Sequence, residues 1–540
     1  MLSDSALEKI NAARRSLLIP ENPLMAGLPE WVDWGRVKAQ AAVVREIVDA
    51  FGDVDVVVLD APTGSGKTLI AELVRRLMDV PSAVYACSTI ALQDQFVKDF
   101  PYSSVLKGRS NYQTLKQVWD VTCADCTATK DKPECEWCGS KQTCPYEIAK
   151  NDAVRSPLAV LNTRYLLTEG NGPGRLAGRR LVIADECDTL ESELMGYVSV
   201  DISVRRARML GLRAPAKVTV QESWGDWFVD AIGKVEAQVE RLPRFDQASV
   251  KERRERKALG SLAAALRVIQ QDSSGWVFTG DARKEEWGTI SFKPVKVDRV
   301  ARGQLWPLGD KWLLMSATPI SARQMVVDDL GWEKEFRTVT MQSTFPVENR
   351  PIVVRPVANM SRKTQEDERG KLLDTLMKMI FQHEYENILI HTVSYKLAGW
   401  LENEIAELVP KSRPVWTYSS SGEKLAVVEE FKEMGGILIA PSLDRGVDLP
   451  DDLCSVIIVA KVPFPNLGDR QVSARMHSTG GQTWYNVQAV RSIVQMTGRG
   501  VRHKQDKAVT YVLDSQFDRL WNSARGLFPT WWTDALQWRR

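Results

Sequence analysis

One short stretch of the chain, residues 61–68, contains the residue types that bind nucleotide phosphates. Gly64 and Gly66 allow a tight turn that brings backbone N–H groups close to phosphate oxygens. Lys67 would reach the β- and γ-phosphates, and Thr68 would hold Mg²⁺. The spacing is that of a phosphate-binding loop in which Ala61 replaces the first glycine. We therefore predict a nucleoside-triphosphate site formed by Ala61, Pro62, Thr63, Gly64, Ser65, Gly66, Lys67 and Thr68.

The flanks of this loop supply the elements that must position it. An apolar run over residues 54–59 predicts a buried strand, and a helical pattern covers residues 69–78. Strand, glycine-rich turn and helix in that order are the setting of a phosphate loop, and a helix N-terminus favours an anion. Upstream, Arg36 and Gln40 could hydrogen-bond an adenine edge, although two polar residues on a helix can equally be solvated.

A second apolar run, residues 180–184, delivers two acids at its end, Asp185 and Glu186. Carboxylates in this position suit two tasks: Asp185 would coordinate Mg²⁺, and Glu186 would activate the attacking water. An acid pair can also simply favour the N-terminus of a following helix. Because the acids follow a buried strand directly, we favour the catalytic interpretation.

Two later motifs add groups that could act across a cleft. Ser316 and Thr318 place hydroxyls on a turn, where they could link hydrolysis to movement. Gln495, Arg499 and Arg502 follow one another on a predicted helix, and arginines supplied across a cleft stabilise charge on a transferring phosphoryl group. Surface salt bridges are the alternative role for these arginines.

Gly446 and Asp448 form a further candidate, because they follow an apolar strand over residues 436–440. A glycine turn and an acid at this point are suited to coupling the state of the bound phosphates to a nucleic-acid backbone. We therefore count both residues with the nucleotide site.

The composition bounds the class of protein. The chain has 540 residues, with 71 Lys and Arg against 69 Asp and Glu, so its net charge is only +2. Any nucleic-acid surface must therefore be local. The N-terminus has no basic region followed by an apolar one, and no window reaches the ~18 apolar residues of a membrane span. We expect a soluble, cytoplasmic protein of three or four domains.

Five of the eight cysteines lie between residues 123 and 144, and they are Cys123, Cys126, Cys135, Cys138 and Cys144. In a large intracellular protein such clustering indicates a metal site rather than a disulfide framework. Two Cys-x-x-Cys pairs are the spacing that binds zinc tetrahedrally. This spacing alone favours zinc over an iron–sulfur cluster, which four thiolates can also hold.

Seven motifs, in order, make the chain resemble superfamily 2 helicases: residues 61–68, 88–95, 185–188, 316–318, 388–395, 441–448 and 495–502. Residues 107–112, 144–146 and 462–465 are similar to narrower marks of the XPD/DinG family of iron–sulfur DNA helicases. The resemblance implies an α/β fold with two RecA-like motor domains. A cysteine-rich metal domain and a helical arch domain are inserted in the first.

The same resemblance predicts the domain boundaries. Motor domain 1 would comprise residues 1–107 with the phosphate loop, 151–190 with the Asp-Glu motif and 303–345 with the Ser-Ala-Thr motif. The cysteine-rich domain would span residues 108–150, and the arch, read as helical and charged, residues 191–302. Motor domain 2 would span residues 346–540.

Two positions depart from the family. The second motif reads Asp-Glu-Cys-Asp rather than the usual Asp-Glu-Ala-His, so Asp188 stands where a coupling histidine is expected. The position of the family's first cluster cysteine is Thr114. Cys135, Cys138 and Cys144 match the last three ligands, and either Cys123 or Cys126 could supply the first. The resemblance then implies a [4Fe–4S] cluster, with zinc as the alternative.

By resemblance the chain is an ATP-dependent 5′-to-3′ DNA helicase that translocates on single-stranded DNA and unwinds duplex at single-strand/duplex junctions. We expect it to act as a monomer, with ATP and Mg²⁺ in the cleft between the motor domains. Tyr112, Trp119, Trp137 and Tyr146 could stack on bases or simply pack. The rivals are a DNA-stimulated translocase that does not separate strands and a structural subunit that clamps DNA. The residues for turnover disfavour the clamp.

Overall fold

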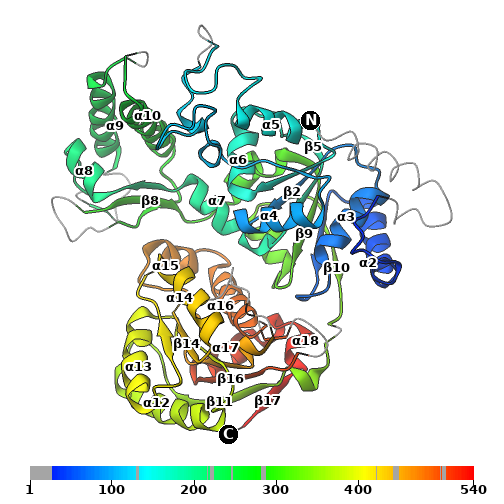
Figure 1. Cartoon of the computed structure of the whole chain (residues 1–540). Helices are drawn as coiled ribbons and strands as arrows, with labels where there is room; N and C mark the ends of the chain where they lie inside the picture. Colours follow the sequence, from blue (N-terminus) through cyan, green and yellow to red (C-terminus); the bar gives the residue numbers. More distant parts are fainter. Residues whose placement is uncertain are drawn as a thin grey trace.

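The computed structural model of the chain describes residues 27–128, 133–215, 217–218, 224–244, 247–280, 288–343, 345–420, 422–441, 449, 451–498, 500–501 and 506–539. These residues form two lobes, each built on a seven-stranded parallel sheet (Figure 1). The first lobe also carries two insertions, one rich in cysteine and one mainly helical. None of the described helices is long and apolar enough to cross a membrane.

The first sheet has the strand order β10-β1-β9-β5-β2-β4-β3. Its strands are β1 (Val56–Asp60), β2 (Ala83–Cys87), β3 (Ser104–Val105), β4 (Leu158–Asn162), β5 (Arg179–Ala184), β9 (Gly309–Ser316) and β10 (Arg337–Thr340). The central strands are nearly continuous apolar runs because helices cover both faces. In the register, Asp60 lies beside Ser316, and Ala184 lies beside Leu314. The carboxyl ends of β1, β5 and β9 therefore share one edge, as the three motifs require.

Helices pack on both faces of this sheet. They are α2 (Trp34–Asp53), α3 (Lys67–Leu77), α4 (Ile90–Asp99), α5 (Pro145–Arg155), α6 (Thr163–Asn171), α7 (Leu190–Val198) and α11 (Asp298–Gln304). Side chains of β1 alternate between the two faces of the sheet and so contribute to two separate cores. Val56 and Val58 belong to one apolar cluster, and Val57 and Leu59 belong to the other. A turn of π-helix, Gln324–Asp329, precedes β10.

The arch insertion between α7 and α11 contains strands as well as helices. Its helices are α8 (Val204–Leu210), α9 (Trp224–Arg241) and α10 (Val250–Gln271), and its strands β6 (Val200–Ile202), β8 (Ile290–Pro294) and β7 (Trp276–Phe278) form an antiparallel sheet. Trp224, Phe228 and Phe292 lie in its own apolar core. The segment was expected to be helical, and it contains a small antiparallel sheet in addition to its helices. The strands are short and pair residue 200 with residue 292, a contact that local patterns do not reveal.

The second sheet has the order β13-β14-β12-β15-β16-β11-β17. Its strands are β11 (Ile352–Ala358), β12 (Ile388–His391), β13 (Val415–Thr417), β14 (Ile437–Ala440), β15 (Val456–Val459), β16 (Val509–Asp514) and β17 (Leu536–Trp538). Its helices are α12 (Gln365–Gln382), α13 (Tyr395–Leu408), α14 (Lys424–Met434), α15 (Arg470–His477), α16 (Gly481–Thr497), α17 (Gln516–Ala524) and α18 (Thr530–Thr533). The predicted fold class, two RecA-like lobes with a cysteine-rich insertion in the first, is confirmed.

The helix that follows the phosphate loop is anchored by a buried ionic cluster. Glu72 accepts 2.7 Å hydrogen bonds from Arg75 Nε, Arg76 Nε and the Tyr102 hydroxyl. Burial alone would raise the pKa of Glu72, but the two guanidinium groups lower it to about 2. All four side chains are buried, so the charges depend on one another for solvation.

Replacement Glu72→Gln should destabilise the first lobe by about 3–5 kcal/mol, because it leaves two buried arginines without their counter-charge. Thermal unfolding followed by circular dichroism would measure the change, with Glu46→Gln on the exposed side of α2 as control. Since the pKa of Glu72 is depressed in the folded state, its contribution is present above pH 4.5 and is lost as the pH falls toward 2. An unchanged midpoint at pH 7 would contradict this account.

Candidate nucleotide site and cysteine cluster

The phosphate loop joins the end of β1 to the start of α3. Gly64 and Gly66 have φ angles of 75° and 78°, in the left-handed region that glycine adopts without strain. A Cβ at position 66 would lie 2.2 Å from Gln40 Nε2, so it would displace the Gln40 amide from the loop. The Lys67 ammonium group donates to the carbonyl oxygens of Ala61, at 3.2 Å, and Pro62, at 3.4 Å. The lysine is thus folded over the loop at the helix N-terminus, where an anion would bind.

The two acids sit on a turn directly after β5. The Tyr85 hydroxyl donates to Asp185 Oδ2 at 2.7 Å, and the backbone N–H of Glu186 donates to Asp185 Oδ1 at 3.0 Å. Ser88 donates to the Glu186 carboxylate. Glu186 adopts a φ of 50°, a left-handed conformation that is unfavourable for a side chain of its size. Burial lowers the pKa of Lys67, and these two acids oppose that shift, so lysine and acids face one site.

Asp188 is the point where three motifs meet. Its buried carboxylate accepts hydrogen bonds from Ser316 Oγ at 2.7 Å and Thr318 Oγ1 at 3.3 Å, both of the first lobe. From the second lobe, Gln495 Nε2 donates to Asp188 Oδ2 at 2.8 Å, and Arg491 Nε lies 3.7 Å from the same oxygen. Asp188 therefore joins the Ser-Ala-Thr turn to helix α16 of the other lobe.

One face of α16 continues this contact between the lobes. Trp484 Nε1 and Gln488 Nε2 donate to Glu191 Oε2, at 2.9 Å and 3.2 Å. Arg475 of α15 lies 2.5 Å from Asp329 and 3.8 Å from Glu191. The interface is thus polar, buried and centred on the short segment that follows the Asp-Glu motif.

The other predicted nucleotide residues fall in different places. On α2, Gln40 Nε2 donates to the carbonyl oxygen of Ser65 at 3.0 Å, which ties the helix to the phosphate loop. Arg36 is exposed, 4.0 Å from Asp33 and 5.8 Å above the Trp31 ring. A role for this pair at adenine stays a prediction. Gly446, Asp448, Arg499 and Arg502 lie outside the described residues.

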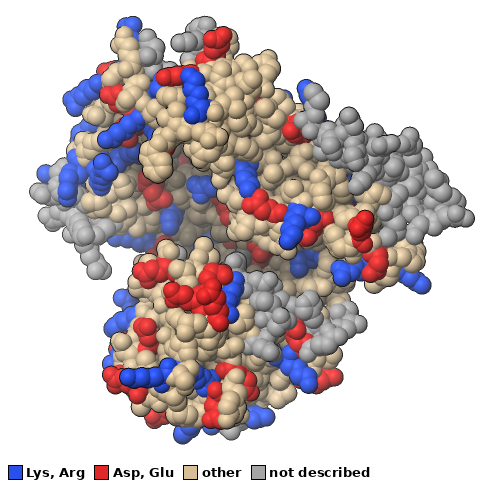
Figure 2. Space-filling model, in the orientation of Figure 1, with Lys and Arg blue, Asp and Glu red and all other residues tan. Residues whose placement is uncertain are grey.

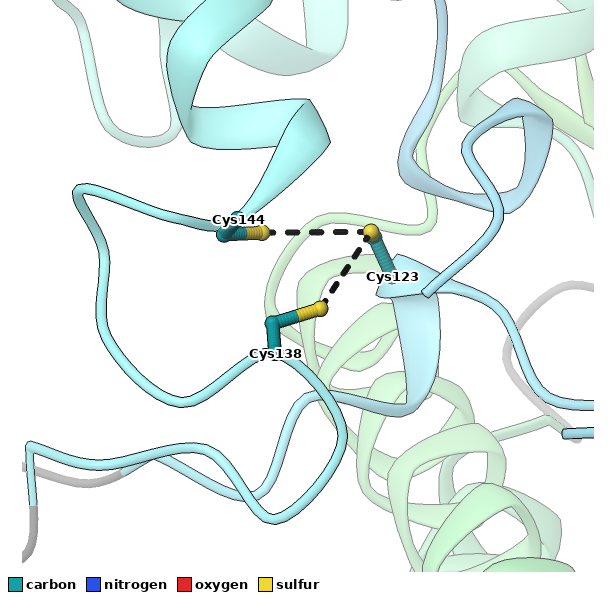
Figure 3. Close-up of side chains that lie close together, drawn as sticks. All are labelled: Cys123, Cys138 and Cys144. Carbon is teal, nitrogen blue, oxygen red and sulfur yellow. Dashed lines mark hydrogen bonds between the residues drawn. The ribbon is translucent and has the colours of Figure 1, made fainter. Parts of the chain in front are cut away.

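Three of the five clustered cysteines converge. The sulfur atoms of Cys123, Cys138 and Cys144 all lie within 4.8 Å of one another, and the three residues are buried. Figure 3 shows Cys123 Sγ facing the other two, 4.0 Å from Cys138 Sγ and 3.8 Å from Cys144 Sγ. Cys144 is the N-cap residue of α5. Such a convergent set of soft donors fits a metal ion or cluster.

The remaining two cysteines lie together beside this trio. Burial alone would raise the pKa of Cys135, but hydrogen bonds from the backbone N–H groups of Thr127, Trp137 and Cys138 lower it to about 7. Backbone hydrogen bonds between Cys135 and Gly139 close the knuckle that carries Cys138. Cys126 is more exposed and interacts with the Cys135 thiol.

A backbone pairing explains how Cys123 reaches the cluster. Thr114, at the position of the family's first ligand, is buried. Gln113 pairs with Thr122 in an antiparallel bridge, and Cys123 donates its backbone N–H to the Tyr112 carbonyl oxygen at 2.9 Å. The chain thus returns alongside residues 112 and 113 and places Cys123 opposite Tyr112, with its Sγ 3.6 Å from the Gln113 carbonyl oxygen.

Two protein-family models match the chain, DEAD/DEAH box helicase over residues 37–210 and helicase C-terminal domain over residues 377–535. Among curated relatives, the Fanconi anemia group J protein homolog of Gallus gallus is 28% identical over 181 residues, covering 28% of this chain and 14% of that protein. The ATP-dependent DNA helicase chl-1 of Caenorhabditis elegans is 29% identical over 112 residues, covering 19% of this chain and 13% of that protein. The matches thus span only a small part of these relatives.

Solved structures agree over nearly the whole chain. A structure titled XPD helicase aligns with 93% of this chain and 99% of its own, with a TM-score of 0.59 at 15% identity. Xpd4 of S. tokodaii aligns with 93% of this chain and 100% of its own, with a TM-score of 0.57 at 13% identity. At such identities the likeness concerns the fold, and the family models supply the motifs. The chain belongs to the XPD/DinG-like family of superfamily 2 helicases.

In this XPD/DinG-like chain, several site residues could not be found from motif spacing alone. Tyr85 lies on β2, one hundred residues before the acid that it orients. Arg491 and Gln488 precede Gln495 by four and seven residues, so helical periodicity could have placed them on the same face. Glu191 has no comparable signal, because its partners are nearly three hundred residues away.

Replacement Asp188→Ala should lower DNA-stimulated ATP turnover at least about tenfold, the equivalent of one lost hydrogen bond to a charged group. ATP affinity should stay unchanged, because Asp188 bonds to the Ser-Ala-Thr turn and α16 rather than to the phosphate loop. Steady-state turnover and binding of a fluorescent nucleotide would separate the two effects. Asp310→Ala, at an exposed position of strand β9, which also carries Ser316, is the control. Full turnover in Asp188→Ala would mean that the lobes are coupled elsewhere.

Proposed function

We propose that the protein is an ATP-dependent DNA helicase that moves 5′ to 3′ on single-stranded DNA and separates the strands of a duplex. The observation that carries the proposal is the Asp188 contact, which connects the nucleotide site in one lobe to α16 in the other. A change at the phosphates can in this way alter the relative position of two RecA-like lobes. The polarity is taken from the family to which the chain belongs.

The described residues suit separate roles in hydrolysis. Lys67 and the backbone of the phosphate loop would hold the β- and γ-phosphates of ATP, and Thr68 with Asp185 would hold Mg²⁺. Glu186, fixed by Ser88, would orient the attacking water. Arg499 and Arg502 follow α16 and would complete the site when the lobes close. We assign these roles from position and chemistry.

The helical insertion offers a surface for the DNA backbone. Figure 2 shows Lys and Arg side chains gathered on the arch, above a hollow that faces the second lobe. Arg205, Lys251 and Lys257 are exposed there, whereas Arg206 is paired with Glu255. Backbone contacts of this kind bind single strands without sequence preference and weaken with salt. A monomer would suffice, since both lobes and the arch belong to one chain.

We also propose that Cys123, Cys135, Cys138 and Cys144 hold a [4Fe–4S] cluster. Three of these thiols already converge, and Cys135 is stabilised as a thiolate by backbone N–H groups beside them. A cluster held by four thiolates would supply a rigid and redox-active anchor for the insertion. Cys126, more exposed, is then the spare thiol. Zinc on the same four sulfurs is the competing assignment.

The helicase proposal is tested with two DNA duplexes that differ only in carrying a 5′ or a 3′ single-stranded tail. We expect unwinding of the 5′-tailed duplex with ATP and Mg²⁺ under anaerobic conditions, and none with Lys67→Ala, which loses its contact to the phosphates. Unwinding from the 3′ tail would reverse the assigned polarity. ATP turnover that is stimulated by single strands without any unwinding would instead indicate a translocase.

The ligand set is tested by replacing single cysteines with serine. Cys123→Ser should lose most of its iron and acid-labile sulfide and the visible absorption of the protein purified anaerobically. Cys126→Ser, the matched control, should retain them. Chemical iron and zinc analysis distinguishes the two metals. Loss of the metal in Cys126→Ser but not in Cys123→Ser would show that Cys126, and not Cys123, is the ligand.

A further inference from the structure

Trp119, in the cysteine-rich segment, leaves 95% of its surface in water, and nearby Leu115 leaves 53%. The other candidate stacking residues of this segment are not available in the same way, since Tyr146 is buried and Tyr112 and Trp137 pack against the core. An indole in water forgoes the favourable burial of a large apolar ring. The ring is therefore open to a planar ligand.

The loop that carries this tryptophan, residues 114–121, is closed at its base. The bridge between Gln113 and Thr122 joins its two ends. Thr114 and Val121, the first and last residues of the loop, are buried. The loop is thus a projection with an anchored base, and the metal-site residue Cys123 follows it directly.

A tight turn sets the direction of Trp119. The Val121 N–H donates to the Val118 carbonyl oxygen at 3.1 Å, so Trp119 and Asp120 are the central residues of a four-residue turn. Asp120 has a φ of 57°, as the third position of a type II turn requires. The second position, which holds Trp119, is the outer corner of such a turn.

Arg254 of arch helix α10 forms hydrogen bonds to this turn. Its guanidinium donates to Asp120 Oδ2 at 2.9 Å and also to the Asp120 backbone carbonyl oxygen. The same group forms a two-pronged pair with Asp125, at 2.6 Å and 2.8 Å. Two-pronged arginine–carboxylate pairs fix geometry as well as adding energy. The backbone of the turn that carries Trp119 is therefore fixed by both the cysteine-rich segment and the arch.

We propose that Trp119 is a stacking platform for one nucleobase of single-stranded DNA, a site that rests on the DNA-binding part of the proposed function. An exposed aromatic ring beside cationic groups is the recurrent means of holding single strands. Lys116, three residues earlier in the loop, is exposed and forms no ion pair within the described part of the chain, so it can meet a phosphate. Because the backbone of the turn is preorganised, the ordering cost of stacking is confined to the rotamers of the Trp119 side chain.

The test compares wild-type protein with Trp119→Ala and Trp119→Phe on a forked duplex with a 5′ single-stranded arm. Stacking predicts that Trp119→Ala binds the fork at least about fivefold more weakly, whereas Trp119→Phe stays close to wild type. Fluorescence anisotropy of a labelled fork measures the affinity. DNA carrying 5-bromodeoxyuridine at single positions should crosslink to the peptide that contains Trp119.

The control is Tyr385→Ala, which removes an aromatic ring that is 92% exposed on the second lobe. It should bind the fork as wild type does, and ATP turnover without DNA should be the same in all variants. Equal binding and crosslinking by wild type and Trp119→Ala would overturn the stacking site, whatever the unwinding result. Weak binding by Trp119→Ala in a protein that fails to unwind either tailed duplex would support the site while removing the helicase function.

Discussion

A buried carboxylate needs donors, and for Asp188 these come from two separate lobes. Ser316 and Thr318 supply two from the first lobe, and Gln495 supplies one from the second. An unpaired buried charge is costly, so the lobes cannot move apart at this point unless water or another group replaces the lost donor. The arrangement gives the interface a preferred geometry. The remaining contacts along α16, from Trp484 to Arg491, also join this helix to the segment that contains Asp188 and Glu191, and they hold the lobes together in the same way.

The cysteine-rich insertion uses backbone pairing to bring together cysteines that lie far apart in the sequence. Thr114 cannot serve as a thiolate, yet the antiparallel bridge between Gln113 and Thr122 brings Cys123 alongside Tyr112, two residues before Thr114. What matters to a metal site is the convergence of donor atoms in space. Sequence spacing alone left both Cys123 and Cys126 open for this reason.

The parts of the fold that depend on local order agree with the sequence prediction. Strand β1, the phosphate loop and α3 form one continuous segment, and β1 and α3 begin and end within about two residues of their predicted limits because their pattern is local. The pairing of β6 with β8 and the donors to Asp188 were beyond such reasoning, because each depends on residues about ninety or more positions apart. Gln40 illustrates a third case, in which the residue was noticed but the structure places its amide against Ser65.

The contact between α10 and the cysteine-rich segment also has a topological consequence. Both insertions are rooted in the first lobe, so their meeting at Arg254 closes a loop of protein whose other links are covalent chain and packed core. Arg254 and Asp120 are partly exposed, and ion pairs of this kind weaken as ionic strength rises. A linear strand can be threaded through a closed loop by its end. Under the proposed function, a covalently circular strand has no end to thread, so its passage through such a loop would require the ion pairs of Arg254 with Asp120 and Asp125 to open.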